Sequence, residues 1–321
     1  MKKILFVFAI AALGFTACEP DNEGSEDVSL LTAETMPDGA FRFVILRAYD
    51  MNDDGIIDRD EANAIDSIDC SGMHISTLKG VELFPNLTYL DCSGNQLTSL
   101  DVSKNTALTY LSCGGNDCMT SLNVSGHTSL TTLVCQNSQL TNLDVSGCTA
   151  LEDLDCDESQ LTSLDVSSCT ALKNLSCFSN QLTALDVSDC TALDELVCSY
   201  NQLTALDVSG CTALRYLTCD DNQLTSIDVS KNTALKTLSC SGNAYHVTAA
   251  MLNMFDLNQL PEGFDISKAI DWNGGTVEGT ALTFAQPEVT YTYNTGYMGE
   301  DDRYKTVTFT LVCDNYDESL K

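Results

Sequence analysis

Residues 193–213 read LDELVCSYNQLTALDVSGCTA, and this 21-residue unit recurs with few substitutions from Leu87 to about Asn243. One cysteine in each copy marks the period, and its successive positions are Cys92, Cys113, Cys135, Cys156, Cys177, Cys198, Cys219 and Cys240. Their separations are 21 residues, except for 22 between Cys113 and Cys135. A fixed period of this length indicates a solenoid, because turns this short bury their apolar side chains only by stacking on one another.

Each copy contains the pattern Leu-x-x-Leu-x-Cys-x-x-Asn-x-Leu, which the first regular turn fills with Leu87, Leu90, Cys92, Asn95 and Leu97. Its alternation of inward and outward side chains predicts one short parallel strand in each turn. The Asn is expected to point inward and to bond backbone groups of neighbouring turns. The pattern resembles the conserved segment of leucine-rich repeats, as in internalin-type repeat proteins and repeat lipoproteins of Bacteroides-type bacteria. The resemblance covers residues 65–243 and implies an α/β solenoid, a horseshoe with a parallel sheet on its concave face.

The second half of the unit returns the chain along the convex side. It carries a recurring aspartate, at Asp101, Asp144, Asp165, Asp186, Asp207 and Asp228. These carboxylates are expected to cap turns by accepting hydrogen bonds from backbone amides. A ladder of calcium ligands is the other interpretation, but Asn123 at one of the same places fits capping better. Ser138 and Ser159 replace the inward Asn in two turns, which predicts a looser stack there.

Thirteen of the 16 cysteines belong to two ladders. Nine occupy the inward strand place, from Cys70 to Cys240, and four recur every 21 residues on the returning side, at Cys148, Cys169, Cys190 and Cys211. Neighbouring strands lie about 4.8 Å apart, which is within reach of a disulfide. Side chains in parallel register point alongside one another, however, so we expect buried, reduced thiols that act as small apolar residues.

The chain is strongly acidic, with 46 acidic against 15 basic residues and a formal net charge of −31. This balance excludes nucleic acid as a partner and argues against a basic contact with membranes. It suits either the binding of divalent cations or solubility alone, and both interpretations stay open.

Residues 1–17 have the features of a signal segment. Lys2 and Lys3 precede an apolar run, and Phe15-Thr16-Ala17-Cys18 resembles a bacterial lipobox, which implies lipidation of Cys18. Phe15 departs from the usual residue there, so a plain signal peptide remains the alternative. The acidic segment 18–29 reads as a flexible tether. Its resemblance to export signals of Bacteroides-type lipoproteins implies a protein that is lipid-anchored to the bacterial outer membrane and exposed at the surface, with that lipid as its only membrane contact.

Residues 30–64 are expected to form a helix, a calcium loop and a second short helix that together cap the solenoid. The stretch DMNDDGIIDRDE at residues 50–61 matches the calcium-binding loop of an EF-hand. Its oxygen ligands for Ca²⁺ would be Asp50, Asn52, Asp54, the Ile56 carbonyl, Asp58 and Glu61. Gly55 allows the sharp turn. The loop is single, which favours a structural clip over a sensor, and an Asx-rich turn that binds nothing is the alternative.

The C-terminal part is expected to contain two elements. A helical cap over residues 244–263, with its helix at Thr248–Leu260, would cover the last turn, since an open solenoid end exposes core. Residues 264–321 then alternate in polarity, as in Val289-Thr-Tyr-Thr-Tyr293, which predicts a small β-strand extension.

Sequence differences between the copies concentrate at the outward strand places, so any specificity is expected on the concave face. The candidate ligand-binding residues are Tyr89, Tyr110, Glu152, Asp153, Asp155, Phe178, Glu195, Tyr200 and Tyr216. Exposed aromatic residues on a rigid sheet suit a protein interface, and they could also stack on sugar rings. We therefore expect a binding or adhesion module for a protein ligand, with a glycan-binding accessory of a polysaccharide uptake system as the alternative. We expect no catalysis and assign no catalytic residue, because the chain has three scattered histidines and no nucleophile or phosphate-binding motif.

Overall fold

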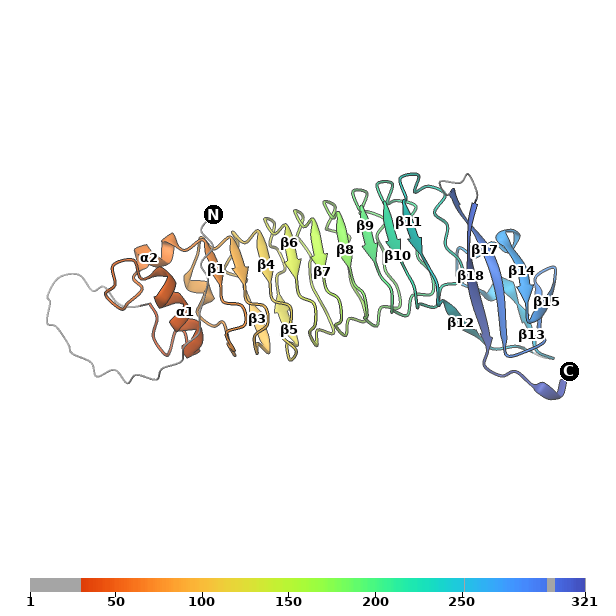
Figure 1. Cartoon of the computed structure of the whole chain (residues 1–321), viewed down its shortest axis with the longest axis horizontal. Coiled ribbons are helices and arrows are strands. Elements are labelled where there is room, and N and C mark those ends of the chain that lie inside the picture. The colour runs from red at the N-terminus through yellow and green to blue at the C-terminus, as the bar shows by residue number, and fades with distance from the viewer. Residues whose placement is uncertain (1–29, 251, 299–303, 321) are drawn as a thin grey trace.

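The computed structural model describes residues 30–250, 252–298 and 304–320, and it is an elongated stack of turns with a different element at each end (Figure 1). The expected signal segment 1–17, the lipidation site Cys18 and the tether 18–29 lie outside these residues. Within the described part of the chain, no helix is long and apolar enough to cross a membrane.

One nine-stranded parallel sheet runs the length of the stack, in the order β1-β2-β4-β6-β7-β8-β9-β10-β11. Its strands have three residues each: β1 Ser67–Asp69, β2 Tyr89–Asp91, β4 Tyr110–Ser112, β6 Thr132–Val134, β7 Asp153–Asp155, β8 Asn174–Ser176, β9 Glu195–Val197, β10 Tyr216–Thr218 and β11 Thr237–Ser239. Each turn of the repeat thus contributes one strand in register with the next, which confirms the solenoid.

The middle residue of each strand points into the core. Leu90 pairs with Leu111, and the same row continues through Leu133 and Leu154 to the end of the sheet. Leu90, Leu111 and Leu133 are completely buried. Burial of a leucine side chain contributes about 1.5–3 kcal/mol, so this repeated row is a main source of the array's stability.

The returning side of each turn is mostly irregular. It contains two short paired strands, β3 (Ser99–Asp101) and β5 (Ser121–Asn123), and one bridge between Asp165 and Asp186. The recurring aspartates cap these turns as expected, because Asp144 Oδ1 accepts a hydrogen bond from Ser146 N at 2.9 Å and the other copies repeat this contact.

The inward asparagines connect neighbouring turns, as expected. Asn201 Oδ1 accepts a hydrogen bond from Leu182 N at 3.0 Å, and its Nδ2 donates to the carbonyls of Cys177 and Cys198. In the two turns with serine, Ser138 Oγ and Ser159 Oγ lie 2.9 Å apart and bond each other. The serine side chains are too short for the asparagine contacts, so these turns have fewer hydrogen bonds to their neighbours.

The cysteine ladders contain no disulfide among the described residues. Burial raises the pKa of the Cys70 and Cys177 thiols to about 12, so these thiols stay protonated and unreactive. In the second ladder, Cys148 Sγ donates to the carbonyl of Val124 in the preceding turn at 3.3 Å. Asn105 makes the equivalent contact to Val81 O. A hydrogen-bond donor is therefore the shared property of that place.

Two helices cap the N-terminal end, α1 (Gly39–Tyr49) and α2 (Arg59–Ala64). The first helix begins later than the expected residue 30. Asp38 is its N-cap and accepts hydrogen bonds from Ala40 N and Phe41 N with Oδ1. Asp38 Oδ2 accepts two further bonds from Ser76, so one carboxylate joins the helical cap to the first turn of the solenoid.

The prediction of a C-terminal helix is wrong. Residues 244–263 instead contain β12 (Ala244–Val247), β13 (Met254–Asp256) and the short 3₁₀ turn η2 (Leu257–Gln259). Leu252 and Asn253 have φ angles of 51° and 57°, which a right-handed helix does not allow. The apolar residues serve strand pairing instead, since Phe255 pairs with Leu282.

The expected β extension is present, and it incorporates β12 and β13. One sheet has the order β12-β18-β17-β14 and the other β13-β16-β15. The remaining elements are η1 Val81–Leu83 in the first turns, and η3 Ile266–Lys268, β14 Ala269–Asn273, β15 Gly275–Glu278, β16 Ala281–Phe284, β17 Glu288–Met298, β18 Tyr304–Cys313 and η4 Glu318–Leu320 in this domain. Tyr291, Tyr293 and Phe309 form its buried aromatic core.

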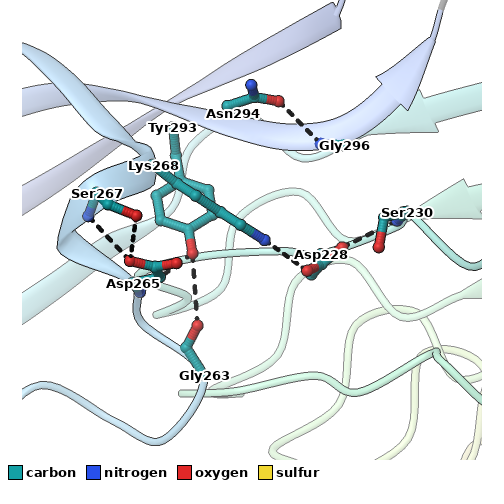
Figure 2. Close-up of polar contacts among 9 residues, drawn as sticks. All are labelled: Asp228, Ser230, Gly263, Asp265, Ser267, Lys268, Tyr293, Asn294 and Gly296. Carbon is teal, nitrogen blue, oxygen red and sulfur yellow. Dashed lines mark hydrogen bonds and ion pairs between the residues drawn. The ribbon is translucent and has the colours of Figure 1, made fainter.

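The β domain is attached to the last turn through specific polar contacts (Figure 2). Lys268 Nζ lies 2.6 Å from Asp228 Oδ2, and Asp228 Oδ1 also accepts the turn hydrogen bond from Ser230 N. Tyr291 donates to Thr225 O at 2.5 Å, and Val229 N donates to Thr295 O at 2.8 Å. The β domain therefore closes the end of the solenoid core that the helix was expected to cover.

Candidate functional site

The expected calcium loop connects α1 to α2 and folds around its own side chains. Asp50 Oδ2 accepts a hydrogen bond from Gly55 N at 2.8 Å, and Asn52 Oδ1 accepts one from Asp54 N at 2.9 Å. Gly55 has a φ of +83°, which other residues adopt only with strain, so glycine is required for this turn. Ile57 is fully buried and holds the loop against the core.

Glu61 closes the loop from helix α2. It is 9% exposed, and its two carboxylate oxygens accept hydrogen bonds from Met51 N at 2.7 Å and from Asp58 N at 3.2 Å. Asp58 Oδ1 in turn accepts from Glu61 N at 2.8 Å, which completes a capping box at the start of α2. Glu61 therefore connects Met51, near the start of the loop, to Asp58 at the start of α2.

The chemistry of the donors fits a hard cation, because all the candidate ligands are oxygen atoms and a buried carboxylate closes the loop. The geometry is less complete. Within residues 30–250, 252–298 and 304–320, no group of three or more acidic, histidine or cysteine side chains converges as a metal site would require. In this conformation the loop oxygens accept bonds from the loop's own amides instead.

The second candidate site is the outward face, defined as the side chains at the first and third positions of the eight strands that follow β1 in the long sheet. The register places the first positions in one row, which consists of Tyr89, Tyr110, Thr132, Asp153, Asn174, Glu195, Tyr216 and Thr237. The second row contains Asp91, Ser112, Val134, Asp155, Ser176, Val197, Thr218 and Ser239. Residues 21 or 22 apart in the sequence are thus direct neighbours.

Aromatic stacking marks the N-terminal part of the outward face. Tyr89 and Tyr110 stack with their ring centroids 4.6 Å apart and their planes 7° apart, as expected from the register. Both side chains are partly exposed. Since the rings support each other, they present a rigid apolar surface with a hydroxyl at its edge.

The turn that contains β7 is the most acidic part of this face. Glu152 pairs with Lys173 at 2.8 Å, whereas Asp153 accepts a hydrogen bond from Asn174. Asp155 is partly buried, and this burial raises its pKa. Its side chain, together with those of Asp153 and Glu195, lines a shallow depression over β6–β9.

The C-terminal part of the outward face carries charges of both signs. The Arg215 guanidinium pairs with Asp194 and lies 5.4 Å from the centre of the Tyr216 ring. A cation over an aromatic face is attracted to the ring electrons, so Tyr216 is held in place by Arg215. The face therefore changes along the stack from aromatic to acidic and then to mixed charge.

Phe178 and Tyr200 do not lie on the outward face itself. They belong to the loops that follow β8 and β9, where their rings meet edge to face with centroids 5.2 Å apart. Tyr200 is 54% exposed, and Phe178 is partly buried beneath it. The structure thus brings together these two candidate residues but separates them from Tyr89 and Tyr110.

Sequence reasoning missed a column of left-handed residues in these loops. The second residue after each strand's cysteine has a positive φ, and in five consecutive turns it is not glycine: Asn137, Glu158, Ser179, Tyr200 and Asp221 have φ between 49° and 56°. The signal was present in the sequence, because Gly94, Gly115 and Gly242 occupy the same place in other turns. This column, together with Phe178, whose ring meets that of Tyr200, is called the loop ridge below.

These features define a leucine-rich-repeat solenoid with a parallel sheet of one strand per turn. A family model described as leucine-rich repeats (2 copies) matches residues 85–126. Internalin J of Listeria monocytogenes is 40% identical to this chain over 70 residues. That match covers 22% of this chain and 8% of the relative, so the chain spans a small part of the relative's length.

The fold of one solved structure agrees with this assignment. An internalin C2 structure from Listeria monocytogenes has a TM-score of 0.52 at 21% identity, covering 65% of this chain and 95% of that chain. The functional domain of internalin J from the same species, described as including a cysteine ladder, has a TM-score of 0.35 at 20% identity and covers 89% of this chain and 98% of that one. The chain therefore contains leucine-rich repeats and has internalin-like relatives.

Proposed function

We propose that this chain is a binding module that recognises a protein ligand through the outward face of its long sheet. The observation that carries the proposal is the division of each repeat. Inward places are nearly constant and build the scaffold, whereas the outward rows change from Tyr89 and Tyr110 through Asp153 and Asp155 to Tyr216. A constant scaffold with a changing surface is the organisation of a recognition array.

The physical properties of the outward face support a protein partner. The stacked pair Tyr89 and Tyr110 offers a large contact area with little loss of side-chain entropy on binding, as interface hot spots do. The acidic turn at β7 favours a partner with basic groups and accelerates its association at low salt. Enzymatic activity has less support, because the groove over β6–β9 is open and shallow.

The test is binding of the purified protein to protein and glycan arrays, with a Tyr89→Ala/Tyr110→Ala double variant beside it. We expect protein ligands that the wild type binds and the double variant loses by at least 10-fold. Phe43→Ala is the matched control, since Phe43 is an aromatic residue 61% exposed on α1, away from the sheet. Binding to sugars alone, lost in the double variant, would support the glycan-binding alternative and overturn the proposal.

We also propose a structural calcium site in the loop between α1 and α2. Its ligands would be Asp50, Asn52, Asp54, the Ile56 carbonyl, Asp58 and Glu61. Its support is the oxygen-only donor set, the glycine turn and the buried carboxylate of Glu61, which links both ends of the loop. Calcium bound there would neutralise the loop carboxylates and tighten the cap on the first turn.

For the location, we propose a surface protein of the bacterial outer membrane that is anchored by lipid on Cys18. The support comes from the sequence alone, through the apolar segment before Cys18 and the acidic segment after it. A Cys18→Ala variant should leave the membrane fraction and become soluble in cell fractionation. Retention of that variant in the membrane would contradict the anchor.

A further inference from the structure

The loop ridge combines the exposed ring of Tyr200 and the partly buried ring of Phe178 with an acidic side chain on either side. Glu158 follows β7, Phe178 and Tyr200 follow β8 and β9, and Asp221 follows β10. Glu158, Tyr200 and Asp221 are all exposed. The ion pairs of the neighbouring outward face, Lys173–Glu152 and Arg215–Asp194, involve other residues.

The backbone of the loop ridge is held in one conformation by hydrogen bonds from turn to turn. Glu158 N donates to Phe178 O at 2.8 Å, and Tyr200 N donates to Asp220 O at 2.9 Å. Asp157 Oδ1 accepts from Phe178 N at 2.7 Å, which adds a side-chain link between the same two turns. The backbone that carries the ridge side chains is therefore preorganised, so a ligand would not have to order the loops on binding.

The non-glycine residues of the loop ridge are costly for stability. A left-handed conformation at a residue with a Cβ atom costs about 1 kcal/mol, somewhat less for Asn and Asp. Gly94, Gly115 and Gly242 show that the fold accepts glycine at this place. Side chains at Glu158, Tyr200 and Asp221 thus oppose stability, and such positions are often retained for function.

The spacing of the ridge side chains determines which ligand they suit. The turns of Glu158 and Asp221 are three strands apart, and at about 4.8 Å per strand this is about 14 Å. An extended peptide rises about 3.4 Å per residue, so residues i and i+4 lie about 14 Å apart. Residues i, i+2 and i+4 of such a peptide also point to the same side.

We propose that the loop ridge binds an extended basic segment of the partner protein, with basic side chains at i and i+4 and an apolar side chain at i+2. The basic groups would pair with Glu158 and Asp221, and the apolar group would pack on Phe178 and Tyr200. This specificity rests on the proposed binding of a protein ligand. It adds a second contact surface beside the outward face.

Neighbouring groups support a cationic ligand. Burial raises the pKa values of Asp155 and Asp157, and the negative charges of the neighbouring Asp157 and Glu158 respectively raise them further. The Tyr200 hydroxyl is hydrogen-bonded to Asp221, which raises the pKa of that phenol. An aromatic ring beside a carboxylate also attracts a cation through its face, so both kinds of group favour Lys or Arg.

The test uses a fluorescein-labelled peptide, GSKSFSKSG, and measures its binding to the full chain by fluorescence anisotropy at low salt. The matched control peptide, GSKFSSKSG, has the same composition and charge, but its phenylalanine points to the opposite side of an extended chain. We expect GSKSFSKSG to bind at least 10-fold more tightly than the control, with affinity falling as salt rises. Equal affinities would show a non-specific attraction between charges and overturn the proposal.

Protein variants locate the binding. Tyr200→Asn keeps a residue that tolerates the left-handed conformation, as Asn137 does in an equivalent turn, so it should fold normally. We expect this variant and Glu158→Asn to weaken GSKSFSKSG binding at least 5-fold. Asp189→Asn, which removes one charge from an exposed place on the returning side, should change it less than 2-fold. Equal losses in all three variants would contradict the proposal.

The two proposals fail in different ways. If protein ligands depend on Tyr89 and Tyr110 but no peptide distinguishes the ridge variants, the proposed function holds and the ridge specificity is wrong. If the ridge variants lose binding to neutral glycans and the wild type binds neither peptide, the occupant of the ridge is a carbohydrate and this inference is overturned.

Discussion

The middle of the array and its two ends are stabilised by different kinds of contact. In the middle, most turns make the same bonds to their neighbours, such as Asn201 to Cys177 O and Leu182 N. At the ends, the contacts occur once, with Asp38 bonding Ser76 at one end and Lys268 bonding Asp228 at the other. The difference shows that a repeat can propagate itself but cannot close its own core.

The largest loss of stability is expected when the buried leucine row in the middle of the array is interrupted. Leu175 is 1% exposed at the centre of β8, so Leu175→Asp places a carboxylate in the core. We expect a loss of at least about 4 kcal/mol in the free energy of unfolding and the loss of a single cooperative transition. Urea denaturation followed by circular dichroism measures this. Thr183→Asp, at an exposed place in the same turn, should cost less than about 0.5 kcal/mol.

Removal of an inward asparagine should cause the next largest loss in the free energy of unfolding. Asn201→Ala removes four hydrogen bonds and leaves the Leu182 amide and the carbonyls of Cys177, Cys198 and Ser199 without this partner. Buried backbone groups without partners are costly, so we expect a loss of about 3 kcal/mol. Gln202→Ala is the exposed neighbouring control. Equal urea midpoints for the two variants would show that the ladder is not a main source of stability.

Calcium should strengthen the N-terminal end specifically. If the loop binds Ca²⁺, a concentration 100 times the Kd should stabilise the cap by about 2.7 kcal/mol. Calorimetric melting with CaCl₂, with MgCl₂ and with EDTA would measure the shift. Glu61→Gln keeps one acceptor oxygen but removes the charge and the second carboxylate oxygen, so it should abolish the calcium shift. An unchanged melting temperature in wild-type protein with calcium and with EDTA would rule the site out.

The two serine turns offer a way to strengthen the middle. Ser138→Asn/Ser159→Asn should restore inward amides like those of Asn116 and Asn180, which bond the cysteine carbonyl of the preceding turn. We expect a gain of about 1 kcal/mol, because the restored bonds replace the present Ser138–Ser159 bond. Chemical denaturation measures it. A loss of stability would mean that the loops around these serines have adapted to the shorter side chain.

The smallest change in the free energy of unfolding is expected at the C-terminal end, where the ion pair of Asp228 is lost as the pH falls. Partial burial raises the pKa of Asp228, but hydrogen bonds from Lys268 and from Ser230 prevail and lower it to about 2, from 3.8. A lowered carboxyl pKa contributes stability that is present above about pH 4 and lost as the pH falls toward 2. The pair is partly exposed, so we expect about 0.5 kcal/mol. Lys268→Met should reduce this pH dependence, measured as the difference in unfolding free energy between pH 5 and pH 2.5.

Much of the fold could be predicted because the same sequence pattern recurs in eight copies. The strand places, the inward Leu, Cys and Asn, the capping aspartates and the Tyr89–Tyr110 stack all follow from the period and the alternation of side chains. The segment from Thr248 to Leu260 could not be predicted in this way. Its apolar residues suit a helix or a strand. Pairing with β16, which is distant in the sequence, makes residues 254–256 a strand.

The candidate binding surfaces could also be predicted only in part from the sequence. The sequence predicted which residues face outward, but Phe178 and Tyr200 were grouped with the outward face, whereas the structure places them on the loop ridge. The loop ridge depends on a backbone conformation that glycine signals in only some of the turns. Ligand spacing also did not decide the shape of the calcium loop, because its oxygens accept hydrogen bonds from the loop's own amides and no group of three or more acidic, histidine or cysteine side chains converges within the described residues.

By itself, the sequence determined the period, the side of each strand that faces the core and the residues that connect one turn to the next. These are local properties, because each turn contacts only its neighbours and every copy repeats the same constraints. Only the tertiary structure decided how the two ends are closed, which loop residues are left-handed and which side chains from distant turns lie together. Those features depend on contacts made once, between segments far apart in the chain, and no repeated pattern encodes them.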